Sequence, residues 1–170
     1  MRRLLTALVA LAALPALAGP AHAAGPLHLG PFQDQGAFTV DCGGFEASVS
    51  GTVTTWFTIW TDDADEVTKF VMRVLAPADT WTNTTTGASI VVRGQFVQTA
   101  ERVPGTTDEW TVTITGHRYM VNEPGEGLIL ADVGRIVYGN LDEDDILSAA
   151  GRHDLALPQE VEPRICAAIA

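Results

Sequence analysis

Residues 45–60 alternate between two sets of side chains, and this pattern limits the possible folds more than any other feature of the chain. The first set is Phe45, Ala47, Val49, Gly51, Val53, Thr55, Phe57 and Ile59, and the second is Glu46, Ser48, Ser50, Thr52, Thr54, Trp56, Thr58 and Trp60. A period of two, with many β-branched and aromatic residues, predicts a β-strand. The segment is too long for one flat strand, so we expect a bend or bulge at Gly51.

Strand patterns continue along the rest of the chain. They cover residues 67–76, 89–99, 110–121 and 128–138, with shorter candidates at 146–149 and 154–157. Turn residues such as Pro104-Gly105 separate them. The chain lacks the periodicity of a long amphipathic helix, and we expect at most one short helical turn before Cys166. The pattern predicts an all-β domain, either a sandwich or a closed barrel.

Two strand segments share the same glycine spacing. Gly87-x-x-Ile90-x-x-x-Gly94-x-Phe96-Val97 matches Gly127-x-x-Leu130-x-x-x-Gly134-x-Ile136-Val137. A glycine in the middle of a strand lets that strand coil sharply, which small barrels require. We therefore expect a small antiparallel β-barrel of roughly seven to nine strands, with a β-sandwich as the alternative.

The N-terminal segment has the features of a secretory signal peptide. Arg2 and Arg3 precede an apolar run, which ends at the small residues of Ala21-His22-Ala23. We expect cleavage after Ala23, an extended lead-in over residues 24–36 and a single barrel domain over residues 37–170. The expected location is therefore secreted and extracellular.

Charge and hydropathy exclude two classes of partner. The leader holds two of the ten basic residues and none of the 21 acidic ones, so eight basic residues remain and the exported part has a formal charge of −13. Such a charge disfavours nucleic acid, which rewards a basic patch. After the leader, the apolar runs are too short for the roughly 18 residues that a membrane-spanning helix needs. We expect neither a nucleic-acid partner nor a membrane span.

Cys42 and Cys166 are the chain's two cysteines, and both lie in the exported part. In an oxidising compartment an even number of cysteines predicts a disulfide. The bond would join the start of the domain to its last few residues. Neither cysteine has a neighbouring cysteine or histidine in sequence, so we expect no metal role for them.

Three polar residues fall where the strand alternation predicts burial. Asp132 shares a face with Leu130 and Tyr138, and Arg118 shares one with Val112 and Ile114. A buried carboxylate needs a partner, and Arg118 is one candidate. A bulge at Gly116 would reverse the faces that follow it, because a slip of one residue moves each side chain to the other side. We expect Arg118, Asp132 and Tyr138 to converge at one end of the barrel, either as a ligand site or as a structural cluster.

The remaining polar residues and tryptophans give weaker indications of a functional site. His153-Asp154 are neighbours in sequence, but no serine or cysteine nucleophile accompanies them, so we assign no catalytic residues. The acidic segment Asp142 to Asp145 lacks the spacing of a calcium loop and is interpreted as a solvated turn. We expect no metal and no cofactor. Trp56 and Trp60 share the polar face of one strand, where they form either a surface platform for a partner or ordinary packing.

Several segments together resemble known proteins. They are Asn83-Thr84-Thr85-Thr86-Gly87, the run from Pro124 to Val137, Gly151-Arg152-His153-Asp154 and the terminal Cys166. In these residues the chain is similar to a group of small secreted actinobacterial proteins of no assigned activity, which implies an exported β-protein. In its glycine-marked strands it also resembles the β-barrels of the allene-oxide-cyclase and dirigent type, without any catalytic motif.

These observations favour a binding domain over an enzyme. We expect an extracellular barrel that binds a small apolar or amphipathic ligand, with Arg118, Asp132 and Tyr138 as polar anchors. One alternative is a barrel enzyme of the cyclase or isomerase type. The other is an interaction or wall-associated module that uses Trp56 and Trp60. The sequence leaves the ligand and the oligomeric state open.

Overall fold

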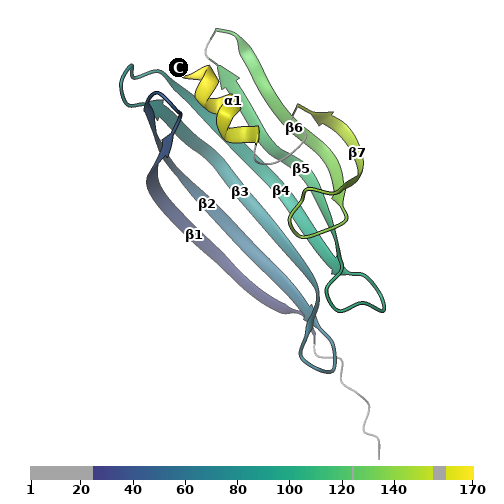
Figure 1. The fold of residues 1–170 in the computed structure, drawn as a ribbon. Helices are drawn as coiled ribbons and strands as arrows, with labels where there is room; N and C mark the ends of the chain where they lie inside the picture. Colours follow the sequence, from purple (N-terminus) through teal and green to yellow (C-terminus); the bar gives the residue numbers. More distant parts are fainter. Residues whose placement is uncertain (1–24, 124, 155–159) are drawn as a thin grey trace, which may run out of the picture.

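A computed structural model of the chain describes residues 25–123, 125–154 and 160–170. These residues form one seven-stranded antiparallel sheet, in which each strand pairs with its neighbour in sequence (Figure 1). The strands are β1 (Leu27–Asp41), β2 (Glu46–Thr61), β3 (Val67–Asn83), β4 (Ser89–Arg102), β5 (Trp110–Glu123), β6 (Gly127–Tyr138) and β7 (Ile146–His153). One helix, α1 (Val161–Ala168), follows them. The predicted all-β antiparallel fold is confirmed, and β1 begins within the segment that we expected as a lead-in.

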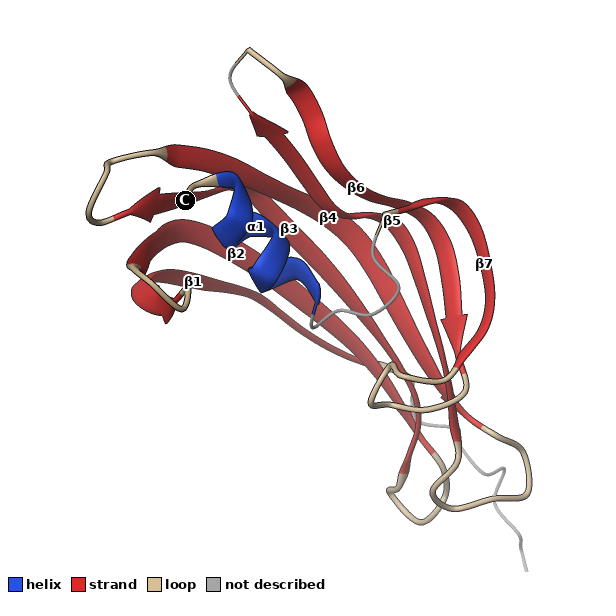
Figure 2. Ribbon diagram, turned by 45° about the horizontal axis from the view of Figure 1, so that its top comes forward, coloured by secondary structure: helices blue, strands red, loops and turns tan. Residues whose placement is uncertain are grey.

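The sheet curls around α1 but does not close. Figure 2 shows the helix lying in the hollow of the sheet, so we call the side that carries α1 the concave face. The strand order runs from β1 to β7 without a pairing between these two, so both are edges. A barrel would need that pairing. The structure thus has the number of strands and the antiparallel pairing that we expected, but the sheet is open and does not form a closed barrel.

The concave face carries two apolar clusters. The first packs against α1 and contains Ala47, Val49, Trp81, Ile90, Val92, Val121 and Leu130 from the sheet with Val161, Ile165 and Ile169 from the C-terminal segment. The second lies further along the strands and contains Ala100, Val112, Ile114, Ile136 and Tyr138, with Phe70, Phe96 and Trp110 at its margin. We call them the helix cluster and the second cluster.

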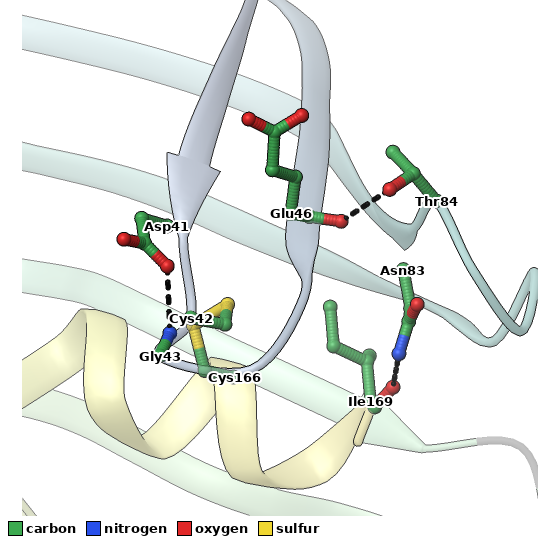
Figure 3. The surroundings of a disulfide bond; sticks show 8 residues. All are labelled: Asp41, Cys42, Gly43, Glu46, Asn83, Thr84, Cys166 and Ile169. Atoms are coloured by element: carbon green, nitrogen blue, oxygen red, sulfur yellow. Dashed lines mark hydrogen bonds between the residues drawn. A yellow bond between two sulfur atoms is a disulfide. The ribbon is translucent and has the colours of Figure 1, made fainter.

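A disulfide fixes α1 to the sheet. Cys42, just after β1, is bonded to Cys166 in α1, 124 residues later (Figure 3), which confirms the predicted bond. Beside it, the Asn83 side-chain amide donates a hydrogen bond of 2.9 Å to the Ile169 carbonyl, so a buried polar group also holds the C-terminus. Pro163 is compatible with the helix because the first turn has no intrahelical acceptor for its missing N–H.

A row of paired glycines crosses β5, β6 and β7. Gly116 is opposite Gly134, and Gly134 is opposite Gly151. Gly134 has φ +136°, a conformation that side chains with a Cβ rarely adopt, and a Cβ built there would overlap the Ala150 carbonyl oxygen. The row lets the three strands bend together, as the mid-strand position of Gly134 predicted.

Register shifts lie near the other glycines that the sequence singled out. The β2–β3 pairing shifts between Ser50 and Thr54, near Gly51, where four steps along β2 match five along β3. The extra residue is therefore on β3, and β2 pairs with β1 without a shift at Gly51, so the bulge that we expected there lies on the neighbouring strand. The β5–β6 pairing shifts between His117 and Tyr119, directly after Gly116. After this shift Tyr119 packs against the helix cluster, so the face of β5 is reversed relative to an uninterrupted strand.

Replacing Gly134 by alanine is expected to destabilise the protein by at least about 2 kcal/mol, because the new Cβ is strained and overlaps β7. Gly36→Ala is the matched control. Gly36 lies in β1, and a Cβ built there meets no atom within 4 Å. Urea unfolding of both variants measures the difference, and equal losses of stability would contradict the assigned role of the glycine row.

Replacing both cysteines by alanine is expected to lower the free energy of unfolding by up to about 5 kcal/mol, since the bond closes a very long loop in the unfolded chain. Urea unfolding of the oxidised protein and of the double variant measures the loss. Replacing Cys42 alone should give the same result as replacing both. A double variant as stable as the native protein would show that packing alone holds α1.

Candidate functional site

Arg118 is the charged residue at the centre of the candidate site. It lies on β5 at the register shift between His117 and Tyr119. Its Nη2 donates a hydrogen bond of 2.5 Å to Glu143 Oε2, and its Nη1 lies 3.5 Å from the Tyr138 hydroxyl. Its guanidinium carbon also lies 5.6 Å from the centre of the Tyr119 ring. The shift therefore places a cation between the two apolar clusters of the concave face.

This guanidinium is buried but incompletely paired. The Arg118 and Glu143 side chains are each only 12% exposed. Arg118 Nε is buried and makes no hydrogen bond to any residue that the structure describes. Burial disfavours the charged form, but the neighbouring Tyr119 and Glu143 outweigh it, and the pKa of Arg118 lies above its ordinary value. Arg118 is therefore a cation with partners for its terminal nitrogens, while its Nε–H donor has no partner among the described residues.

Tyr138 contributes a hydroxyl from β6. It is almost fully buried within the second cluster. Burial raises the pKa of Tyr138, Arg118 opposes this, and the carboxylates of Glu143 and Asp132 add to the rise. The hydroxyl therefore stays protonated and can donate or accept a hydrogen bond.

Asp132 is buried on the same face of β6, as the alternation predicted. Its partner is His153 on β7, with Oδ1 lying 2.5 Å from Nδ1 of the imidazole. The two residues are directly opposite in the β6–β7 register. The other ring nitrogen, Nε2, lies 3.3 Å from the Ala150 carbonyl oxygen, so an oxygen atom lies near each of the two ring nitrogens.

The structure thus brings the three expected residues to one face, but with different partners. Arg118 and Tyr138 are in contact, while Asp132 pairs with His153 rather than with Arg118. Asp154, the sequence neighbour of His153, instead pairs with Arg152 and accepts a hydrogen bond from the Ala131 N–H.

Two residues of the site, Glu143 and His153, were not assigned to it by the sequence. Glu143 belongs to the acidic segment that we interpreted as a solvated turn. Its neighbours Asp142, Asp144 and Asp145 are exposed, whereas Glu143 is partly buried. Its backbone is left-handed, with φ +58°, and its side chain turns inward to Arg118. His153 reaches Asp132 only through strand pairing, which a single sequence does not reveal.

The two tryptophans lie apart from this site. Alternation along β2 places Trp56 and Trp60 on the side of the sheet opposite Phe57 and Ile59. The Lys69 amine lies 5.3 Å from the centre of the Trp60 ring and also pairs with Glu101. Both tryptophans are half-buried rather than exposed, so packing with neighbours accounts for much of their surface.

A search for metal and membrane features gave two findings within residues 25–123, 125–154 and 160–170. The acidic, histidine and cysteine side chains there form no group of three or more that is arranged to hold a metal ion. In the same ranges, no helix is long and apolar enough to cross a membrane.

Comparison with known protein families, with curated proteins and with solved structures found no match. The likeness to secreted actinobacterial proteins and to the barrels of the allene-oxide-cyclase type therefore stays a prediction. The candidate site rests on its own geometry, a buried cation and an imidazole–carboxylate pair on the concave face.

The raised pKa of Tyr138 predicts a specific loss of stability in alkali. The unfolded chain releases the phenol proton at about pH 10, whereas the folded protein retains it, so stability is complete below pH 10 and falls as pH rises above it. Urea unfolding between about pH 8 and pH 11 should show this fall. Tyr138→Phe is expected to have a shallower alkaline slope, and a slope as steep as that of the native protein would contradict the assignment.

Proposed function

We propose that this chain is an exported domain that binds a small amphipathic ligand on its concave face, with Arg118, Asp132 and Tyr138 as the polar anchors. The observation that carries the proposal is the Nε of Arg118, which is buried and lacks a partner among the described residues. Leaving a charged donor unsatisfied costs free energy, and native proteins seldom do so without a reason. An oxygen acceptor on a ligand would supply the missing partner.

The surroundings of Arg118 favour a ligand with an apolar body. The second cluster, with Ile114 and Ile136, begins beside the cation, and the helix cluster continues on its other side through Tyr119. Ligand sites in proteins are mostly apolar, with a few polar groups that fix orientation. Ile114, Ile136 and Tyr138 are each at most 4% exposed, so a ligand would have to displace the side chains that now cover them.

The expected location agrees with the chemistry of the chain. The leader predicts export, and the Cys42–Cys166 bond is stable in the oxidising compartment to which export leads. We infer that the domain acts outside the cytoplasm.

A second candidate function rests on the pair of Asp132 and His153. A carboxylate that holds an imidazole is a common arrangement for a general acid or base. The Tyr138 hydroxyl and the Arg118 cation on the same face would polarise a bound oxygen. These groups support an enzyme of the cyclase or isomerase type as the alternative. The other alternative, an interaction module, has less support because Trp56 and Trp60 are half-buried.

The first experiment is native mass spectrometry of the protein recovered from culture medium, compared with its denatured mass. A mass excess that disappears on denaturation is expected and would give the size of the ligand. The purified protein is then titrated with 1-anilinonaphthalene-8-sulfonate, an amphipathic anion whose fluorescence reports binding to an apolar surface.

Matched variants localise the binding. Arg118→Met is expected to weaken probe binding about tenfold, which corresponds to the loss of one charge-assisted contact. The double variant Arg118→Met with Glu143→Gln avoids an unpaired buried carboxylate and should show the same loss. Arg135→Met, an exposed arginine on β6, should bind like the native protein. Equal binding by all variants, in the absence of a bound ligand, would refute the proposed site.

A further inference from the structure

β1 is a long sheet edge that is interrupted near its start by Pro31 and a register shift, but it pairs with β2 without a shift from Phe32 to Asp41. It spans 15 residues, and almost all of them are exposed. One long side of the strand pairs with β2, and the other faces no strand among the residues that the structure describes. The hydrogen-bonding groups along this free side are therefore available to a partner strand.

Two exposed aromatic side chains of β1 lie on the concave face, with Asp34 and Gly36 between them on the same face. Phe38 is opposite Val49 of the helix cluster, and Phe32 is opposite Thr55, so both rings lie on that face. Phe32 is 53% exposed and Phe38 is 58% exposed. Exposed aromatic rings on an unpaired sheet edge mark an interaction site or an aggregation hazard.

β1 also carries little charge to repel another strand. Its charged residues are Asp34 and Asp41, and it contains no lysine or arginine. Natural edges are commonly blocked by such residues or by being short. The other edge, β7, fits that description better, since it has eight residues and includes Arg152. The two edges therefore differ, and β1 is the open one.

We propose that β1 pairs with β1 of a second copy of this chain, in an antiparallel arrangement with a two-fold axis at Gln35. If the axis passes through a residue, the two concave faces remain on the same side of one continuous sheet. An axis at Gln35 places Phe32 opposite the partner's Phe38. The same axis places Asp34 opposite the partner's Gly36, so the two Asp34 carboxylates are diagonal neighbours about 7–8 Å apart rather than directly opposite.

The neighbouring registers are less favourable. An axis at Asp34 would place this carboxylate opposite the partner's Asp34, and like charges directly opposite are destabilising. An axis at Gly36 would place Asp34 opposite the partner's Phe38 and lose the aromatic pair. The pairing would end near Pro31, where the β1–β2 register shifts between Leu29 and Phe32. The sequence of β1 is thus self-complementary around Gln35.

Light scattering after size exclusion tests the dimer. The native protein is expected to be a dimer that dissociates on dilution. Phe38→Lys is expected to be a monomer with the thermal midpoint of the native protein at a dilution where the native protein is also monomeric. Leu147→Lys on β7 is the matched control, because Leu147 is also 58% exposed. A native protein that is monomeric at high concentration would overturn the proposal. Loss of the dimer in both variants would overturn it in favour of head-to-tail pairing of β1 with β7.

Cysteine cross-linking tests the register independently of these variants. In the proposed arrangement Gln35 lies opposite the partner's Gln35 at about 5 Å between Cα atoms, within the range of a disulfide. Gln35→Cys should therefore give a covalent dimer on mild oxidation. Gln33→Cys should not, because its equivalent in the partner lies four positions along the strand, about 13 Å away. Equal cross-linking of both variants would overturn the assigned axis.

Discussion

The structure depends on how one face of a curled single sheet is covered. The strands form one layer, and on the concave face the helix cluster is buried by a helix of only eight residues. So short a helix is not stable by itself and needs tertiary contacts. Cys166 and the Asn83–Ile169 hydrogen bond fix it to the sheet at the end where β1 finishes and β2 begins. Without that attachment, Trp81, Ile90 and Leu130 would face solvent.

The bend of the sheet and the candidate site share one origin. The paired glycines on β5, β6 and β7 let these strands approach closely and turn together, and the register of β5 shifts immediately after Gly116. This shift places Arg118 beside Tyr138 while Tyr119 packs toward the helix cluster. The register in which Gly134 is opposite Gly151 also places His153 opposite Asp132. The glycine row and the register shift beside it therefore shape the backbone and also determine where Arg118, Asp132 and His153 lie.

Local patterns in the sequence were sufficient for most of the strands and for the bend at Gly134. The alternation over 45–60 predicted β2, whereas β1 begins in the expected lead-in and the bulge expected at Gly51 lies on β3. Burial of Asp132 also followed from alternation. Glu143 and His153 did not, because their contacts join residues that are more than twenty positions apart. Closure of the barrel was expected from local glycine spacing, but pairing of the two edge strands is a long-range property that such spacing does not determine.

The order of the strands has a consequence for how the chain is assembled. Each strand pairs with the strand made just before it, so the sheet can grow one hairpin at a time as the chain emerges. Cys42 lies at the end of the first strand, and its partner is made 124 residues later. The covalent link therefore becomes possible only after all seven strands have been made. Pairing of neighbouring strands does not need the disulfide, because Cys166 follows all of them in the chain.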